Sequence, residues 1–277
     1  MGLRINTNVQ ALTAQRFLSN NHDMQNKSLE RLSSGSRINK AGDDAAGLAI
    51  SEKLKASIRS IKQATRNAND GVSLVQVAEG AMNETANILT RLRELSIQGA
   101  SDTIGDTERG FINKEVQQLK SEVDRISSTT EFNGNHLLNG STEKLDIQVG
   151  IHNNPMEDRL VFESKSLVTS LSALGIGNLS TENKEDSRQN LEAIDSAITH
   201  LNDNRSTLGA LQNRLQSTIN NSQIYTENLA AANSRIRDTD MAEETSELVK
   251  SNILTQATVS VLSQANQNPQ LALKLMG

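Results

Sequence analysis

The sequence predicts a mainly α-helical fold: an elongated rod of long antiparallel, coiled-coil-like helices with a small β-hairpin, plus paired N- and C-terminal helices. Apolar and small residues recur at heptad spacing through most of the chain, which is typical of helices that pack lengthwise. Only 2 of the 277 residues are prolines, the residue that breaks helices. Aromatic residues make up 2% of the chain, although rings usually fill the core of a compact enzyme.

The first long helix is predicted over about residues 44–98. Its seam alternates steps of four and three residues, and every seam position is apolar or small. The seam comprises Ile50, Leu54, Ser57, Ile61, Ala64, Ala68, Gly71, Val75, Ala78, Met82, Thr85, Leu89 and Leu92. Either Asp43 or Asp44 is placed to cap its start. At a rise of 1.5 Å per residue, this helix would be about 80 Å long.

Two more helices are expected at about residues 106–129 and 184–236, each with its own heptad seam. Between them the period of the apolar residues changes to two, which predicts a β-hairpin at about residues 143–164. The alternating residues are Leu145, Ile147 and Val149, then Leu160 and Phe162. Together these elements form a predicted rod domain, residues 44–236.

The two chain ends, residues 1–43 and 237–277, are predicted to form a discontinuous helical core domain. Ile5, Val9 and Leu12 begin an apolar stripe near the start of the chain. The last helix carries apolar residues on two nearly opposite faces. Its candidate contact residues are Leu248, Leu254, Ala257, Val261, Leu262 and Leu271. An isolated helix in water has nothing to cover an apolar face. These ends must therefore pack against each other or against other copies, which indicates an assembly protein.

The composition and the net charge argue against several classes of binding partner. The net charge of −5 gives no electrostatic case for binding nucleic acid or an acidic membrane. No apolar stretch approaches the roughly 18 residues of a membrane span, so membrane insertion is not expected. The chain has no cysteine, which fits life outside the reducing cytosol. The first residues lack the apolar core of a secretory signal, which taken alone favours the cytoplasm.

The sequence contains no recognisable catalytic or metal-binding motif. No two of the four histidines stand at the i, i+4 spacing of a helical metal site, and no HExxH motif occurs. The Gly-Asp-Asp sequence at 42–44 is better explained as a bend and helix cap than as an acidic metal site. No catalytic residue, metal or cofactor is therefore expected. A cytosolic helical enzyme is the alternative from a different class, and the missing acid–base or metal constellation disfavours it.

Several segments resemble the bacterial flagellin family. Residues 32–54, LSSGSRINKAGDDAAGLAISEKL, are similar to its N-terminal hallmark, and residues 65–84 and 91–100 continue the likeness. Residues 228–270 are similar to its C-terminal hallmark. The resemblance covers most of the chain in several blocks, so it is more specific than any single short motif.

The resemblance implies a subunit that polymerises into the extracellular flagellar filament used for swimming. It also implies export in unfolded form through a type III apparatus, which needs no cleavable signal. In the family, the paired terminal helices line the filament core and the rod surrounds them. Only about 20 loop residues follow the hairpin here, so variable outer domains are not expected. A hook–filament junction protein or another axial flagellar protein is the alternative, but the continuous block RINKAGDDAAGLAIS favours flagellin proper.

One candidate contact surface lies on the predicted rod. Arg91, Leu95 and Gln98 stand at i, i+4 and i+7 on one helix face, and Glu115 lies on the adjacent antiparallel helix. By resemblance, these positions contact neighbouring protofilaments and are read on free monomers by an animal Toll-like receptor. Thr90 replaces the glutamine common in the family, which puts the receptor role in doubt. The competing interpretation places Leu95 in the core and leaves Arg91 merely solvated.

The C-terminal stripe, Leu248 to Leu271, is the second candidate surface. The resemblance implies that a cytosolic secretion chaperone covers it before export and that it packs in the filament core afterwards. Other implied partners are further copies of the chain, sibling flagellins in a mixed filament, and the filament cap and hook-junction proteins.

Overall fold

A computed structural model of the chain describes the backbone of residues 7–276 and the side chains of residues 7–267. Helices dominate it, which confirms the predicted fold class. The α-helices in the described range are α1 (Val9–Ser34), α2 (Ala45–Gly99), α3 (Asp106–Thr129), α4 (Lys184–Arg237) and α5 (Met241–Met276). The described residues form two compact units: those up to Ala56 together with those from Glu227 onwards, and Ser57–Thr226. This division falls within α2 and α4, whereas the sequence analysis placed it in the loops that flank them.

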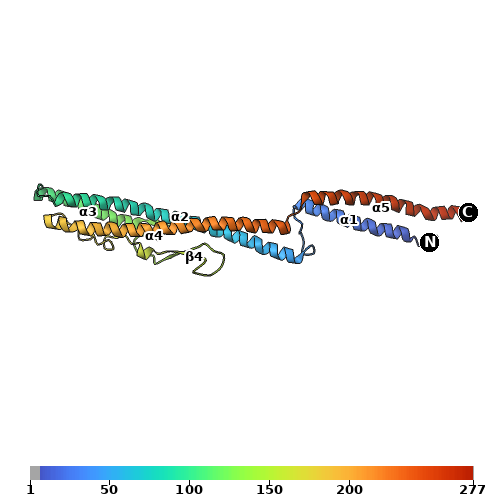
Figure 1. Cartoon of the computed structure of the whole chain (residues 1–277), viewed down its shortest axis with the longest axis horizontal. Helices are drawn as coiled ribbons and strands as arrows, with labels where there is room; N and C mark the ends of the chain where they lie inside the picture. The colour runs from blue at the N-terminus through green and yellow to red at the C-terminus, as the bar shows by residue number, and fades with distance from the viewer. Residues whose placement is uncertain (1–6, 277) are drawn as a thin grey trace. The chain divides into compact units, whose positions relative to one another are not determined.

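The unit of residues 57–226 is built from long helices that lie alongside one another (Figure 1). All predicted seam positions of α2 from Ile61 to Leu92 are buried. Six of them, Ala68, Val75, Ala78, Met82, Leu89 and Leu92, join one core cluster with residues of the other two helices. These are Ile112, Val116 and Val123 of α3, and Ile194, Leu201, Leu208, Leu215 and Ile219 of α4. In the other unit, Ile50 is exposed although the heptad pattern placed it in the seam.

Side chains cap both ends of α2. The Asp44 carboxylate accepts a hydrogen bond from the Gly47 N–H at 2.8 Å, so Asp44 is the capping residue. Asp43 instead organises the preceding loop. The Lys40 backbone N–H and the Lys27 ammonium, with a smaller contribution from the Asn39 N–H, lower the pKa of Asp43 to about 2. At the other end, the nearly buried Arg109 donates hydrogen bonds to the carbonyls of Gly99 and Ser101, both at 3.0 Å.

Two small antiparallel hairpins follow α3. Strands β1 (Glu131–Phe132) and β2 (Asn135–His136) are joined by Asn133-Gly134. Both turn residues have positive φ, 51° and 81°, as a type I′ turn requires. Strands β3 (Leu145–Gln148) and β4 (Arg159–Phe162) form the predicted hairpin, with Leu145 opposite Phe162 and Ile147 opposite Leu160. The first pair was not predicted, because each of its strands has only two residues.

The second hairpin and the segment after it cover the helices. The Asn67 side chain of α2 donates a hydrogen bond to the Gln148 carbonyl at 3.1 Å. A short 3-10 helix, η1 (Ser164–Ser166), follows β4. Beyond it, the buried Lys120 ammonium of α3 donates to the carbonyls of Gly177 at 2.7 Å and Leu179 at 3.1 Å. Burial lowers the pKa of Lys120. Between β4 and α4 the described chain is therefore a loop held against α3, and it does not form a further domain.

Two glycines of α2 provide a matched test of how the hairpin packs. A Cβ added at Gly71 would lie 2.8 Å from Ile147 Cδ1 of the hairpin, whereas one added at Gly80 would meet nothing within 4 Å. We expect Gly80→Ala to raise the free energy of unfolding by about 1 kcal/mol, because alanine is the better helix former. Gly71→Ala should be at least about 1 kcal/mol less stable than Gly80→Ala, because Ile147 must move. Chemical denaturation of both variants measures this difference, and equal gains would contradict the packing described.

Candidate assembly surfaces

Helices α1 and α5 pair antiparallel within one unit and meet through polar contacts (Figure 1). The Asn8 side chain donates to the Ala265 carbonyl at 2.8 Å, and Asn21 donates to Thr258 Oγ1 at 3.1 Å. Gln25 donates to Asn252 Oδ1 at 2.7 Å. Nearer the linkers, Arg31 Nη1 lies 3.3 Å from Glu244 Oε2. Since residue numbers rise along α1 as those of their partners fall along α5, these contacts fix one antiparallel register.

The side chains buried in this unit's helix pair are small or polar. They are Ala14, Asn21 and Ser28 of α1, and Glu244, Ser251 and Ala265 of α5. Most of the large apolar side chains instead face solvent. They are Val9, Leu12, Phe17, Met24 and Leu29 of α1, and Met241, Val249, Ile253, Leu254, Val259 and Val261 of α5. Exposed apolar surface of this extent marks an interaction site.

A groove of about 560 Å³ runs between α1 and α5 and gathers part of this apolar surface. It is lined by Ala14, Phe17, Asn20, Asn21 and Met24 of α1, and by Leu254, Ala257, Thr258 and Val261 of α5. Three of the predicted tail residues therefore lie together here.

The other predicted end residues are more scattered. Leu248 and Leu262 are half-buried, and Val9 and Leu12 are exposed. Ile5 and the side chain of Leu271 lie outside the described residues.

The rod surface centres on an ion-pair network. Arg91 Nη2 lies 2.8 Å from Glu115 Oε1 of α3, and Arg91 Nη1 lies 3.0 Å from Glu94 Oε2 one turn away. Hydrogen bonds first to Glu115 and then to Glu94 raise the pKa of Arg91. All three side chains stay largely exposed, as does Gln98. The structure thus brings Arg91 and Glu115 into direct contact across two helices.

Leu95 does not share this exposed face, so that part of the sequence-based prediction is wrong. Its side chain is 1% exposed and belongs to the core cluster. A single heptad seam describes one helix contacting one partner. Here α2 contacts both α3 and α4, so Leu95 is buried beside the first seam, which Ser96 and Gly99 continue. An apolar residue just outside the first seam therefore becomes core.

Two exposed apolar residues near the ion pair were missed from the sequence. Phe111 is 63% exposed and precedes Glu115 by one helical turn, and Ile97 is 50% exposed beside Gln98. The Lys114 ammonium lies 5.6 Å from the centroid of the Phe111 ring. Phe111 could have been found from the sequence, because it is one of 4 phenylalanines and falls outside the α3 seam.

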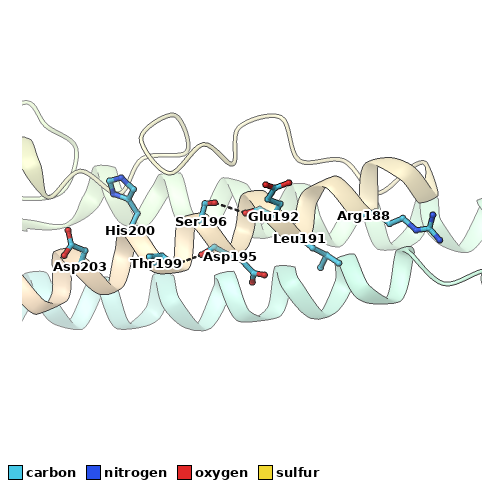
Figure 2. A pocket seen from close by; sticks show the side chains of 8 residues that line it. All are labelled: Arg188, Leu191, Glu192, Asp195, Ser196, Thr199, His200 and Asp203. Carbon is cyan, nitrogen blue, oxygen red and sulfur yellow. Dashed lines mark hydrogen bonds between the residues drawn. The ribbon is translucent and has the colours of Figure 1, made fainter.

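Figure 2 shows an open groove along α4, lined only by residues of that helix. Glu192, Asp195 and Asp203 make it acidic. The hydroxyls of Ser196 and Thr199 both donate to carbonyls of their own helix at 2.9 Å, so neither is held ready for a ligand. Asp195 is paired with Arg93 of α2 at 2.7 Å, and this contact lowers the pKa of Asp195.

Two further searches cover the described part of the chain. Residues 7–276 contain no helix with both the length and the apolar character of a membrane span. They also contain no group of three or more His, Cys, Asp or Glu side chains arranged to hold a metal ion.

Comparison with known proteins identifies the family of the chain. A model of the bacterial flagellin N-terminal helical region matches residues 5–143, and a model of the bacterial flagellin C-terminal helical region matches residues 191–276. The chain belongs to the bacterial flagellin family. Flagellins are structural proteins rather than enzymes, and this flagellin is a structural subunit of the extracellular flagellar filament, which serves motility.

Relatives that align over nearly their whole length support this assignment. Flagellin from Halalkalibacterium halodurans is 44% identical over 98% of this chain and 99% of its own length. The flagellar filament 30.7 kDa core protein of Treponema maltophilum is 42% identical over 98% of this chain and 99% of its own. The crystal structure of Bacillus cereus flagellin matches with a TM-score of 0.51 at 30% identity, over 57% of this chain and 88% of that one.

A structural likeness bears on the alternative of another axial flagellar protein. The structure of a flagellar hook-associated protein from Vibrio parahaemolyticus matches with a TM-score of 0.58, over 71% of this chain and 100% of that one. Its sequence identity is 12%, so it shares the fold alone. The high identity to filament flagellins over the full length favours a filament subunit.

The rod surface yields a stability prediction that separates its residues. Leu95→Ala should lower the free energy of unfolding by about 2–5 kcal/mol, because it opens a cavity in the core. Arg91→Ala should leave the melting temperature close to that of the unmodified chain, because exposed ion pairs contribute little. Thermal unfolding of the two variants, followed by circular dichroism, checks both. Similar losses in the two variants would mean that Arg91 is as structural as Leu95.

Proposed function

We propose that this flagellin polymerises mainly through the outward apolar faces of α1 and α5. The observation that carries the proposal is the exposure of large side chains such as Phe17, Met24 and Val261, while small and polar ones fill the inner seam. Burying each large side chain against a neighbouring copy would contribute about 1.5–3 kcal/mol. The terminal segments, residues 1–43 and 237–277, would then line the filament core, with residues 44–236 as the surrounding rod.

A second contact surface between copies is proposed on α2 and α3. It comprises Arg91, Glu94, Gln98 and Glu115, with Phe111 and Ile97 taking the apolar role first assigned to Leu95. An exposed aromatic side chain beside an arginine is typical of an interface hot spot. A host Toll-like receptor would read the same face on free monomer. The variant Arg91→Ala/Phe111→Ala tests the two roles separately. Reduced swimming would support the contact between copies, and reduced reporter-cell signalling by free monomer would support the receptor role. An unchanged value in either assay would contradict the corresponding role.

The C-terminal stripe is also proposed to bind a secretion chaperone before type III export. Its exposed residues Leu254, Ala257 and Val261 would otherwise favour premature association in the cytosol. Contacts with sibling flagellins, the filament cap and the hook-junction proteins would use the same ends, because these partners meet the subunit in the axial structure. The substitution described next also reports on the chaperone, because a charge in the stripe should weaken its capture of the chain.

The decisive variant is Val261→Asp. Val261 is 56% exposed in the groove, so the isolated chain should tolerate the carboxylate. In the polymer the charge would be buried, at a cost of several kcal/mol unless it is neutralised. We expect normal thermal unfolding of residues 57–226 and no filaments by electron microscopy.

Ser263→Asp is the matched control, because Ser263 is exposed on the same helix outside the groove lining. It should polymerise. Normal filaments of Val261→Asp would contradict the proposed role of this face.

A further inference from the structure

The dipeptide Asn-Gly occurs twice in the chain, at Asn133-Gly134 and at Asn139-Gly140, and the fold holds the two pairs differently. An asparagine followed by glycine can lose its side-chain amide, because the next backbone nitrogen can attack the side-chain carbon where no Cβ obstructs it. Both pairs lie in the segment between α3 and β3. Their reactivity in the folded chain therefore depends on local structure.

The first pair is fixed in the hairpin turn between β1 and β2. Asn133 has a φ of 51° and Gly134 a φ of 81°. In this type I′ turn, the mirror image of type I, ψ of the first central residue is about +30°. That torsion puts Cβ of Asn133 nearly opposite the Gly134 nitrogen across the Cα–C bond. Attack would require this bond to rotate and the pairing of β1 with β2 to open, so the fold protects this amide.

The second pair has a polarised side-chain carbonyl. Asn139 Oδ1 accepts one hydrogen bond from the Ser141 backbone N–H at 2.9 Å and another from the Ser141 hydroxyl at 2.7 Å. The first bond closes a ring that contains both Cγ of Asn139 and the Gly140 nitrogen, so the side chain curls back along the peptide bond. Two donors on one carbonyl oxygen draw electron density from its carbon, and they stabilise the negative oxygen that forms during attack.

The attacking nitrogen of the second pair is available. Within the described part of the chain the Gly140 N–H donates no hydrogen bond, and no strand pairing spans the Asn139–Gly140 bond. Ser141 is exposed, so water has access to the site. The second pair therefore combines an activated carbon, a nitrogen without a hydrogen bond to lose, and solvent.

We propose that Asn139 is a self-modification site, at which the folded chain deamidates through a cyclic imide while Asn133 stays intact. The Gly140 nitrogen forms a bond to Cγ of Asn139, and the Cγ–Nδ2 bond breaks. The proton of the Gly140 N–H leaves with the amide group as ammonia. Water then opens the five-membered ring at one of its two carbonyls, which gives aspartate or isoaspartate. Water is the only co-reactant, and the inference does not depend on polymerisation.

The isoaspartate product would lengthen the backbone just before the second hairpin, because it adds one methylene carbon to the main chain. Leu138 is held in place on one side. It is fully buried, and its carbonyl accepts hydrogen bonds from Ser127 Oγ at 2.9 Å and from the Thr169 N–H at 3.0 Å. Gly140 is confined on the other side, since an added Cβ would lie 2.9 Å from Val168 Cγ2. The extra length would therefore be taken up by the exposed loop before β3.

Ageing of verified full-length monomer at neutral pH, followed by mass-spectrometric peptide mapping, tests the proposal. Trypsin releases both amides in one peptide, residues 126–144, so each is the internal standard for the other. In the folded chain Asn139 should deamidate roughly tenfold or more faster than Asn133, because only its side chain is oriented for attack. In denaturant the two rates should become similar, because glycine follows both residues.

Substitutions of Ser141 isolate the contribution of its hydroxyl group. Ser141→Ala removes one of the two donors and should slow the deamidation of Asn139 by roughly three- to tenfold, the kinetic equivalent of one hydrogen bond. Ser141→Thr keeps both donors and is the matched control, so its rate should equal that of the unmodified chain. Asn139→Gln would have to close a larger ring and should show no deamidation at this position. Ser141 is exposed, so the melting temperature of its variants should stay unchanged.

Three results would overturn the proposal. Equal rates at Asn133 and Asn139 in the folded chain would mean that the fold does not select the site. Aspartate at position 139 without isoaspartate would mean direct hydrolysis by water and no attack by the Gly140 nitrogen. Equal rates in Ser141→Ala and Ser141→Thr would exclude a role for the hydroxyl group. The comparison of folded with denatured chain uses no substitution, so it decides the question even where a variant unfolds.

Discussion

Helices α1 and α5 meet through small and polar side chains, and most of their large apolar side chains face solvent. This arrangement is the constraint on which the rest of the account depends. A hydrogen bond such as that from Asn21 to Thr258 contributes about 1 kcal/mol net, whereas burying a side chain such as Phe17 or Val261 contributes about 1.5–3 kcal/mol. The free energy that would hold the pair together therefore lies mostly in contacts that a single copy does not make. We therefore expect the folding of these ends to depend on assembly.

The unit of residues 57–226, in contrast, buries most of its large apolar side chains within one chain. The apolar α2 seam residues from Ala68 to Leu92 are buried in one cluster with residues of α3, α4 and the hairpin residues Leu160 and Phe162. A unit with its own core can fold alone. The surface that it is proposed to offer to other copies combines the charged Arg91–Glu115 network with the exposed Phe111 and Ile97. Apolar contacts would supply most of the free energy of polymerisation, and charged contacts would supply direction and rate.

The heptad repeat predicted the helices well, because each long helix keeps one face toward partners over many turns. It could not predict Leu95, because burial there depends on a third helix that the pattern of one helix does not reveal. Phe111 was overlooked for the complementary reason, since a residue outside the seam carries no periodic signal. The two-residue strands β1 and β2 are too short to show alternation, although Asn-Gly is a residue pair typical of a hairpin turn. Polar seam residues such as Asn21 and Thr258 were invisible to a search for apolar stripes.

Hydrogen exchange of the α1 and α5 amides, measured on verified monomer and on filaments of the same chain, tests the central claim most directly. If the free energy of the pair lies in contacts between copies, both helices should exchange nearly as fast as unfolded chain in the monomer, while α2 and α4 between residues 57 and 226 stay protected. Filament formation should then protect α1 and α5 strongly. Protection of α1 and α5 in the monomer equal to that in the filament would contradict the account, because the pair would then be stable without neighbours.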